Sequence, residues 1–65
     1  MIKTGSVVEL IDEDNTPMAG YRYKVLARYT ERGQKRCELQ QINDDTGNLI
    51  GVVFWAPLDD VRKAR

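Results

Sequence analysis

The sequence predicts an all-β fold: one small domain, residues 1–65, of about five short strands with a short helical turn near the C-terminus. Three observations predict it. Bulky apolar residues at positions 52–55 run into Pro57 and then into one turn of helix-like sequence. A second apolar run follows Gly5 at the other end of the chain. Between these two ends, alternating segments are separated by residues typical of turns.

The first half of the chain holds two expected strands. Residues 6–11 form the first, with Val8 and Leu10 on one face because side chains alternate along a strand. The polar segment 12–20, with a proline and a terminal glycine, is an expected loop. Residues 21–29 then alternate most regularly of all. One face of this strand would carry Tyr21, Tyr23, Val25, Ala27 and Tyr29, and the other Arg22, Lys24, Leu26 and Arg28.

The second half holds two more expected strands. A glycine-containing turn at 31–34 precedes the strand 36–42, and an Asn/Asp/Gly turn at 43–48 follows it. Residues 49–55 form the most apolar strand, in which Gly51 marks a bulge or a sharp bend. Pro57 ends this strand, residues 58–61 form the helical turn, and we expect the residues after Val61 to be loose. The predicted core is Val8, Leu10, Tyr23, Val25, Leu39, Val52 and Phe54.

This pattern resembles the small bacterial SH3-like barrel domains. The resemblance rests on the first strand Gly5-Ser6-Val7-Val8-Glu9-Leu10, the long loop after it and the terminal Pro-Leu-x-x-Val turn at 57–61. It implies a barrel of about five strands, with a helical turn between the last two. SH3-like barrels serve as peptide-binding, Tudor-like, KOW-like ribosomal and plasmid-encoded modules, so the fold alone carries no function.

Composition argues against several classes of function. The chain has no histidine, the most frequent general acid or base, and no spaced catalytic pair stands out, so we expect a protein that is not an enzyme. Cys37 is the only cysteine, which leaves no ligand set for zinc, and we expect neither a metal nor a cofactor. A lone cysteine, the lack of an apolar leader and the lack of a long apolar run favour a cytoplasmic protein without a membrane partner.

The first functional hypothesis is a non-catalytic interaction module that binds a protein partner. In peptide-binding SH3 domains, aromatic side chains line a groove for extended ligands. This chain offers aromatic and proline residues together with an acidic loop. The expected partner-binding residues are Tyr21, Trp55, Pro57, Asp12 and Asp14.

The alternative hypothesis is a nucleic-acid-binding barrel of the KOW or Tudor kind. Residues 20–37 hold six basic side chains and one acidic one, although the whole chain has no net charge. The alternation favours tyrosines that face the core over tyrosines that stack on bases, so the expected contacts are to phosphates. The candidate residues are Arg22, Lys24, Arg28, Arg32, Lys35 and Arg36.

A third expectation concerns assembly. A chain of 65 residues buries only about 60% of the surface that its unfolded form exposes, and self-association is a common additional support. The strand 49–55 carries no polar side chain on either face, which predicts a homodimer or a higher oligomer with Leu49, Val53 and Trp55 in the interface. The competing interpretation is a monomer in which residues 57–61 fold back over the outer face of that strand.

Overall fold

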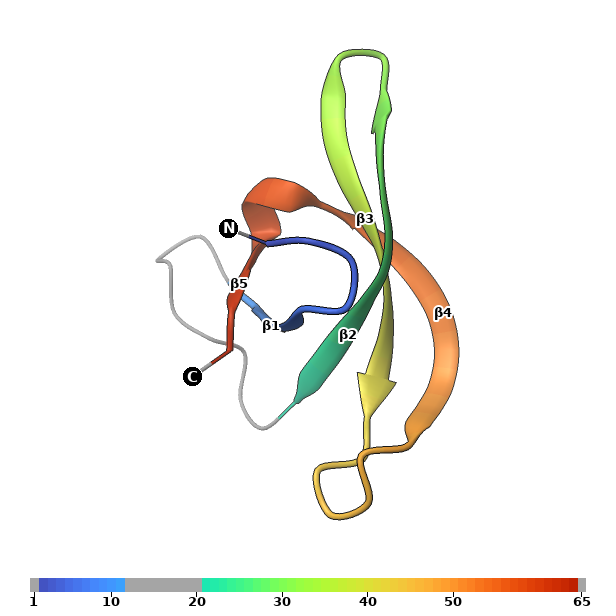
Figure 1. The fold of residues 1–65 in the computed structure, drawn as a ribbon. Coiled ribbons are helices and arrows are strands. Elements are labelled where there is room, and N and C mark those ends of the chain that lie inside the picture. Colours follow the sequence, from blue (N-terminus) through green and yellow to red (C-terminus); the bar gives the residue numbers. More distant parts are fainter. Residues whose placement is uncertain (1, 12–20, 65) are drawn as a thin grey trace.

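The computed structural model describes residues 2–11 and 21–64, and these residues form five strands and one short helix. The strands are β1 (Val7–Leu10), β2 (Arg22–Glu31), β3 (Gln34–Ile42), β4 (Leu49–Pro57) and β5 (Val61–Lys63). A 3₁₀ turn, η1 (Leu58–Asp60), lies between β4 and β5 (Figure 1). The all-β class, the number of strands and the helical turn near the C-terminus are therefore confirmed. No helix among the described residues is long and apolar enough to cross a membrane.

All five strands belong to one antiparallel sheet with the order β4-β3-β2-β1-β5. Each of the strands β1 to β3 pairs with the strand that follows it in the sequence. Strand β5 pairs with the other edge of β1, the edge that does not face β2. Within the described residues β4 and β5 do not pair, so the sheet stays open. The closed barrel that the resemblance implies is replaced by a curled sheet, in which η1 packs against β3.

The residues after Val61 are ordered as a strand, which corrects the expectation that they are loose. Glu9 of β1 lies opposite Arg62 of β5, and the Arg62 Nε atom is 3.6 Å from a Glu9 carboxylate oxygen. The turn η1 aligns this pairing because the Ile11 amide donates to the Asp60 carbonyl at 2.9 Å. Three residues are too few to display an alternating pattern, so only the resemblance to SH3-like barrels, which places a strand after the helical turn, pointed to β5.

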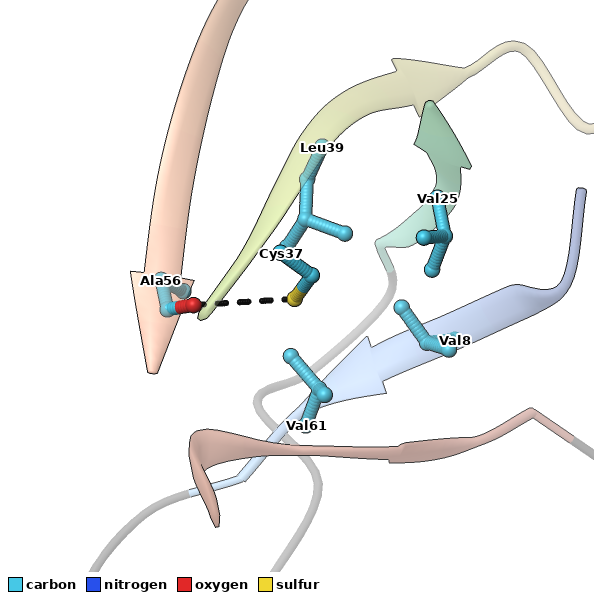
Figure 2. Packing of buried hydrophobic residues seen from close by; sticks show 6 residues of the cluster. All are labelled: Val8, Val25, Cys37, Leu39, Ala56 and Val61. Atoms are coloured by element: carbon cyan, nitrogen blue, oxygen red, sulfur yellow. Dashed lines mark hydrogen bonds between the residues drawn. The ribbon is translucent and has the colours of Figure 1, made fainter. Parts of the chain in front are cut away.

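The buried core draws residues from all five strands (Figure 2). Its fully or almost fully buried members are Val8, Val25, Cys37, Leu39, Ala56 and Val61. Leu10, Tyr23 and Phe54 pack against them, and the rings of Tyr23 and Phe54 meet edge to face at 5.4 Å between centroids. Six of the seven predicted core residues are thus confirmed.

Val52 is the exception, since 80% of its surface is exposed. The cause is a bulge in β4 at Gly51. The sequence predicted a bulge or bend at this glycine, but not that it would move Val52 out of the core. Between the pairs Leu39↔Phe54 and Gln41↔Ile50, one residue of β3 stands opposite three residues of β4. Gly51 adopts a positive φ of 77°, and its carbonyl accepts a hydrogen bond from the Gln40 side-chain amide at 3.0 Å. A bulge interrupts the two-residue period, so alternation no longer places Val52.

A second bulge, in β2, overturns the predicted faces of that strand. Val25 pairs with Leu39, but the next pair is Ala27 with Glu38, which leaves Leu26 as the extra residue. Beyond it, Ala27 and Tyr29 lie on the face opposite to Tyr23 and Val25. Arg28 correspondingly stands across from Cys37, on the core side of β3. The bulge coincides with the place where β2 also bonds to the N-terminal segment: the Val25 amide donates to the Ser6 carbonyl, and the Gly5 amide to the Val25 carbonyl.

Both predicted turns are confirmed. Arg32 and Gly33 have positive φ angles of 52° and 77°, which is the geometry of a two-residue type I′ hairpin turn. Strands β2 and β3 continue to this turn as a long hairpin, which projects beyond the rest of the sheet (Figure 1). At the other end of β3, the Asn43 side-chain oxygen accepts hydrogen bonds from the Asp45 and Thr46 amides and so fixes the 43–48 turn.

Candidate binding surfaces on strand β4 and the β2–β3 hairpin

Trp55 is the largest exposed apolar side chain on β4, with 55% of its surface accessible. It lies on the outer face, opposite Glu38 of β3, while its neighbour Ala56 points into the core. The guanidinium carbon of Arg36 is 4.2 Å from the centroid of the Trp55 ring. One part of the ring is therefore covered by a cation, and more than half of the side chain remains open to a partner.

Arg36 is held over Trp55 by two further contacts. Its Nη2 atom donates to the Gln34 side-chain oxygen at 3.1 Å, and its Nε atom lies 3.7 Å from a Glu31 carboxylate oxygen. The second distance is that of an ion pair and is too long for a hydrogen bond. Tyr29 stands directly across from Arg36 on β2 and is 39% exposed. We call Tyr29, Arg36 and Trp55 together the Trp55 cluster.

The apolar surface continues from Trp55 along the rest of β4. Five of the exposed large apolar side chains belong to this strand: Leu49, Ile50, Val52, Val53 and Trp55. Because β4 is the end strand of the sheet, its outer backbone edge has no neighbouring strand among the described residues. A long apolar edge of this kind is a template for pairing with another chain, although the bulge at Gly51 interrupts its regular part.

The structure separates the residues that the sequence assigned to partner binding. Pro57 follows Trp55 by two positions on β4, shares its face and is half-buried opposite Arg36. Tyr21 is exposed, but it precedes β2 at the end of the sheet where Arg22 pairs with Ile42. Ala27 of β2 pairs with Glu38, which in turn pairs with Trp55. Tyr21 precedes Ala27 by six residues, so it lies about 20 Å of extended strand away from the position level with Trp55. Asp12 and Asp14 lie outside the described residues.

The six candidate phosphate-binding residues are also divided. Arg22 and Lys24 lie before the bulge in β2 and pair with Ile42 and Gln40. Arg28 lies after the bulge on the opposite face, and the remaining three, Arg32, Lys35 and Arg36, follow in the hairpin. The separation arises because the bulge at Leu26 inverts every later side chain, which the sequence pattern did not reveal.

A hollow of about 130 Å³ lies in this hairpin and is lined by Arg28, Tyr29, Thr30, Lys35 and Arg36. Three of these five residues are cationic and none is acidic. Tyr29 is the residue that sequence reasoning missed, because regular alternation placed it in the core. No feature of the sequence marks the bulge that brings it to the surface.

Cys37 is chemically protected at the base of the same hairpin. Its side chain is fully buried, and its Sγ atom donates to the Ala56 carbonyl at 3.6 Å (Figure 2). Burial raises the pKa of the thiol above its ordinary value, and the charge of Arg28 opposes part of that rise. At neutral pH the group is therefore a protonated thiol and a poor nucleophile. No group of three or more Asp, Glu or Cys side chains in the described parts of the chain is arranged to hold a metal ion.

In comparisons with known proteins, no family model matches the chain, and no curated protein or solved structure matches it significantly.

Proposed function

We propose that this protein is a non-catalytic interaction module that binds a protein partner along strand β4, with Trp55 as the central contact. The observation that carries the proposal is the concentration of exposed apolar side chains on one end strand, whose outer backbone edge pairs with no other strand of the described residues. Aromatic anchors surrounded by smaller apolar residues are typical of the centre of a protein interface.

Two features support a partner that supplies an extended segment. The outer backbone edge of β4, which has no neighbour among the five described strands, offers amide and carbonyl groups to an added strand, the mode of binding called β-augmentation. Val53 and Trp55 are two positions apart on β4 and both exposed, so both can contact the side chains of that added strand. Arg36 fixes the Trp55 ring before binding, so less side-chain entropy is lost on association.

The test compares two aromatic residues with the same exposure. Trp55 and Tyr21 are both 55% exposed, but only Trp55 lies on β4. The partner is first isolated from the native host and then measured against the purified variants by calorimetry. Trp55→Ala should lose affinity by at least tenfold, since a central aromatic contact contributes about 2 kcal/mol or more. Tyr21→Ala should bind as the unmodified chain does.

Two results would contradict the proposal. The first is an equal loss of affinity in Tyr21→Ala and Trp55→Ala, which would place the interface elsewhere. The second is full affinity for the partner in both Trp55→Ala and Val53→Lys, because each substitution alters the proposed contact surface. Circular dichroism of each variant checks that the sheet is intact.

A further inference from the structure

We infer that the hollow in the β2–β3 hairpin is a phosphate-binding site for single-stranded nucleic acid, with Arg28 and Lys35 as its cationic contacts. The hollow is separate from the β4 edge, and binding there does not depend on what β4 binds. It contains two of the six basic side chains that the sequence offers as phosphate contacts, apart from Arg36.

The register of the hairpin brings the two cations to the same face. Arg28 pairs with Cys37, and Thr30 pairs with Lys35. Residues directly opposite each other share a face, as do alternate residues along a strand. The side chains of Arg28, Thr30 and Lys35 are therefore neighbours, two cations beside a hydroxyl, and all three line the hollow.

These two cations are available to a ligand, in contrast to the third. Arg36 is engaged by Glu31, Gln34 and the Trp55 ring. Within the described residues no hydrogen bond or ion pair occupies the side chain of Arg28 or Lys35. Glu31, the one acidic residue between positions 28 and 36, is itself directed to Arg36. An anion entering the hollow thus meets two positive charges that form no ion pair with a carboxylate of residues 2–11 or 21–64.

The shape of the site favours an extended phosphodiester over a compact enclosed ligand. The hollow belongs to a hairpin that projects beyond the rest of the sheet (Figure 1), so a nucleic-acid strand can approach it from solvent. Tyr29 also lines the hollow and is partly exposed, but its side chain lies on the outer face of the hairpin, opposite to those of Arg28 and Lys35. A flexible single strand can place its phosphates on the cations of one face and a base on the exposed ring of the other, which are the two contacts that single-strand-binding surfaces combine.

Fluorescence anisotropy with labelled oligo(dT) and oligo(rU) of about 12 nucleotides, a length within the usual site size of small single-strand-binding domains, tests this inference. Two phosphate contacts should give a slope of log K against log salt of roughly −1.4, from about −0.7 per phosphate on a single strand. Arg28→Gln and Lys35→Gln should each reduce that slope by about half and weaken binding at low salt. Tyr29→Ala should lower the affinity and leave the slope unchanged.

Lys24→Gln is the matched control, because it removes the same charge from the same strand on the other side of the bulge. It should leave both the affinity and the slope unchanged. A loss in Lys24→Gln as large as that in Arg28→Gln would overturn the inference, since it would indicate a diffuse charge effect. The absence of oligonucleotide binding at low salt would also overturn it. A third contradicting result would be seen by NMR: inorganic phosphate shifts the side-chain resonances of Arg28 and Lys35, but no oligonucleotide binds. That result would assign the hollow to a small anion.

Discussion

The guanidinium of Arg36 lies 4.2 Å from the centre of the Trp55 ring, although the two residues are not directly paired across the strands. In the register of β3 and β4, Arg36 stands opposite Pro57 and Trp55 stands opposite Glu38. The contact is therefore a diagonal one on the outer face. It links the β2–β3 hairpin to the exposed end strand and orders the exposed Trp55 side chain.

A double-mutant cycle on this pair should give a coupling free energy of about 0.5–1 kcal/mol, the usual value for an exposed cation–π contact. Urea unfolding of Arg36→Gln, Trp55→Leu and the double variant provides the measurement. Lys35 replaces Arg36 in the control cycle, because it is adjacent in sequence but lies on the other face of β3. A coupling between Lys35 and Trp55 as large as that of the Arg36 pair would show that the effect is not specific to the observed contact.

Leu39→Ala should lower the free energy of unfolding by about 2–5 kcal/mol, because the side chain is fully buried between the strands and its removal leaves a cavity. That is a large share of the stability of so small a domain. Val52→Ala is the control on the neighbouring strand, and its effect should be close to zero since the side chain is mostly exposed. Chemical denaturation of both variants measures the difference. Similar costs at the two positions would contradict the placement of Val52 on the bulge.

Stability should fall as the pH rises above about 9, in part through Cys37. Its pKa is raised in the folded chain from an ordinary value of 9.0, so the folded state keeps a proton that the unfolded state releases. The contribution is present below the unfolded pKa and is lost as the pH rises through the folded pKa. Cys37→Ala removes this group, so the difference in stability between the two proteins should shrink as the pH increases in this range. A difference that stays constant with pH would show that the thiol does not titrate in this way.

We propose that in the absence of another partner two copies associate through their β4 edges. The strand carries no charged residue, so an antiparallel pairing of two β4 strands brings no like charges together. The exposed side chains of Leu49, Val53 and Trp55 would then contact the β4 strand of the second copy. Light scattering at tens of micromolar should then give twice the 7.5 kDa mass of the chain. Val53→Lys should restore the mass of one chain with an unchanged circular dichroism spectrum. A mass of 7.5 kDa for the unmodified protein would reject the dimer.

The elements that depend on local chemistry are predictable from the amino-acid sequence. Gly33 and the polar residues at 43–48 specified the turns, and Pro57 marked the region where β4 gives way to η1. Regular alternation correctly placed Val8 of β1 and Leu39 of β3 in the core. These features follow from backbone freedom and from the two-residue period, which act over a few neighbouring residues.

Which side chains meet at the candidate sites depends instead on how the strands pair across the sheet. The bulge at Leu26 inverts the faces of the second half of β2, so Tyr29 reaches the surface and Arg28 joins Lys35. The bulge at Gly51 exposes Val52, and the strand β5 exists because η1 turns it back onto β1. Each of these depends on pairing with a strand that is distant in the sequence. A one-residue change in such a pairing moves every later side chain to the other face, and the local pattern of residues carries no record of it.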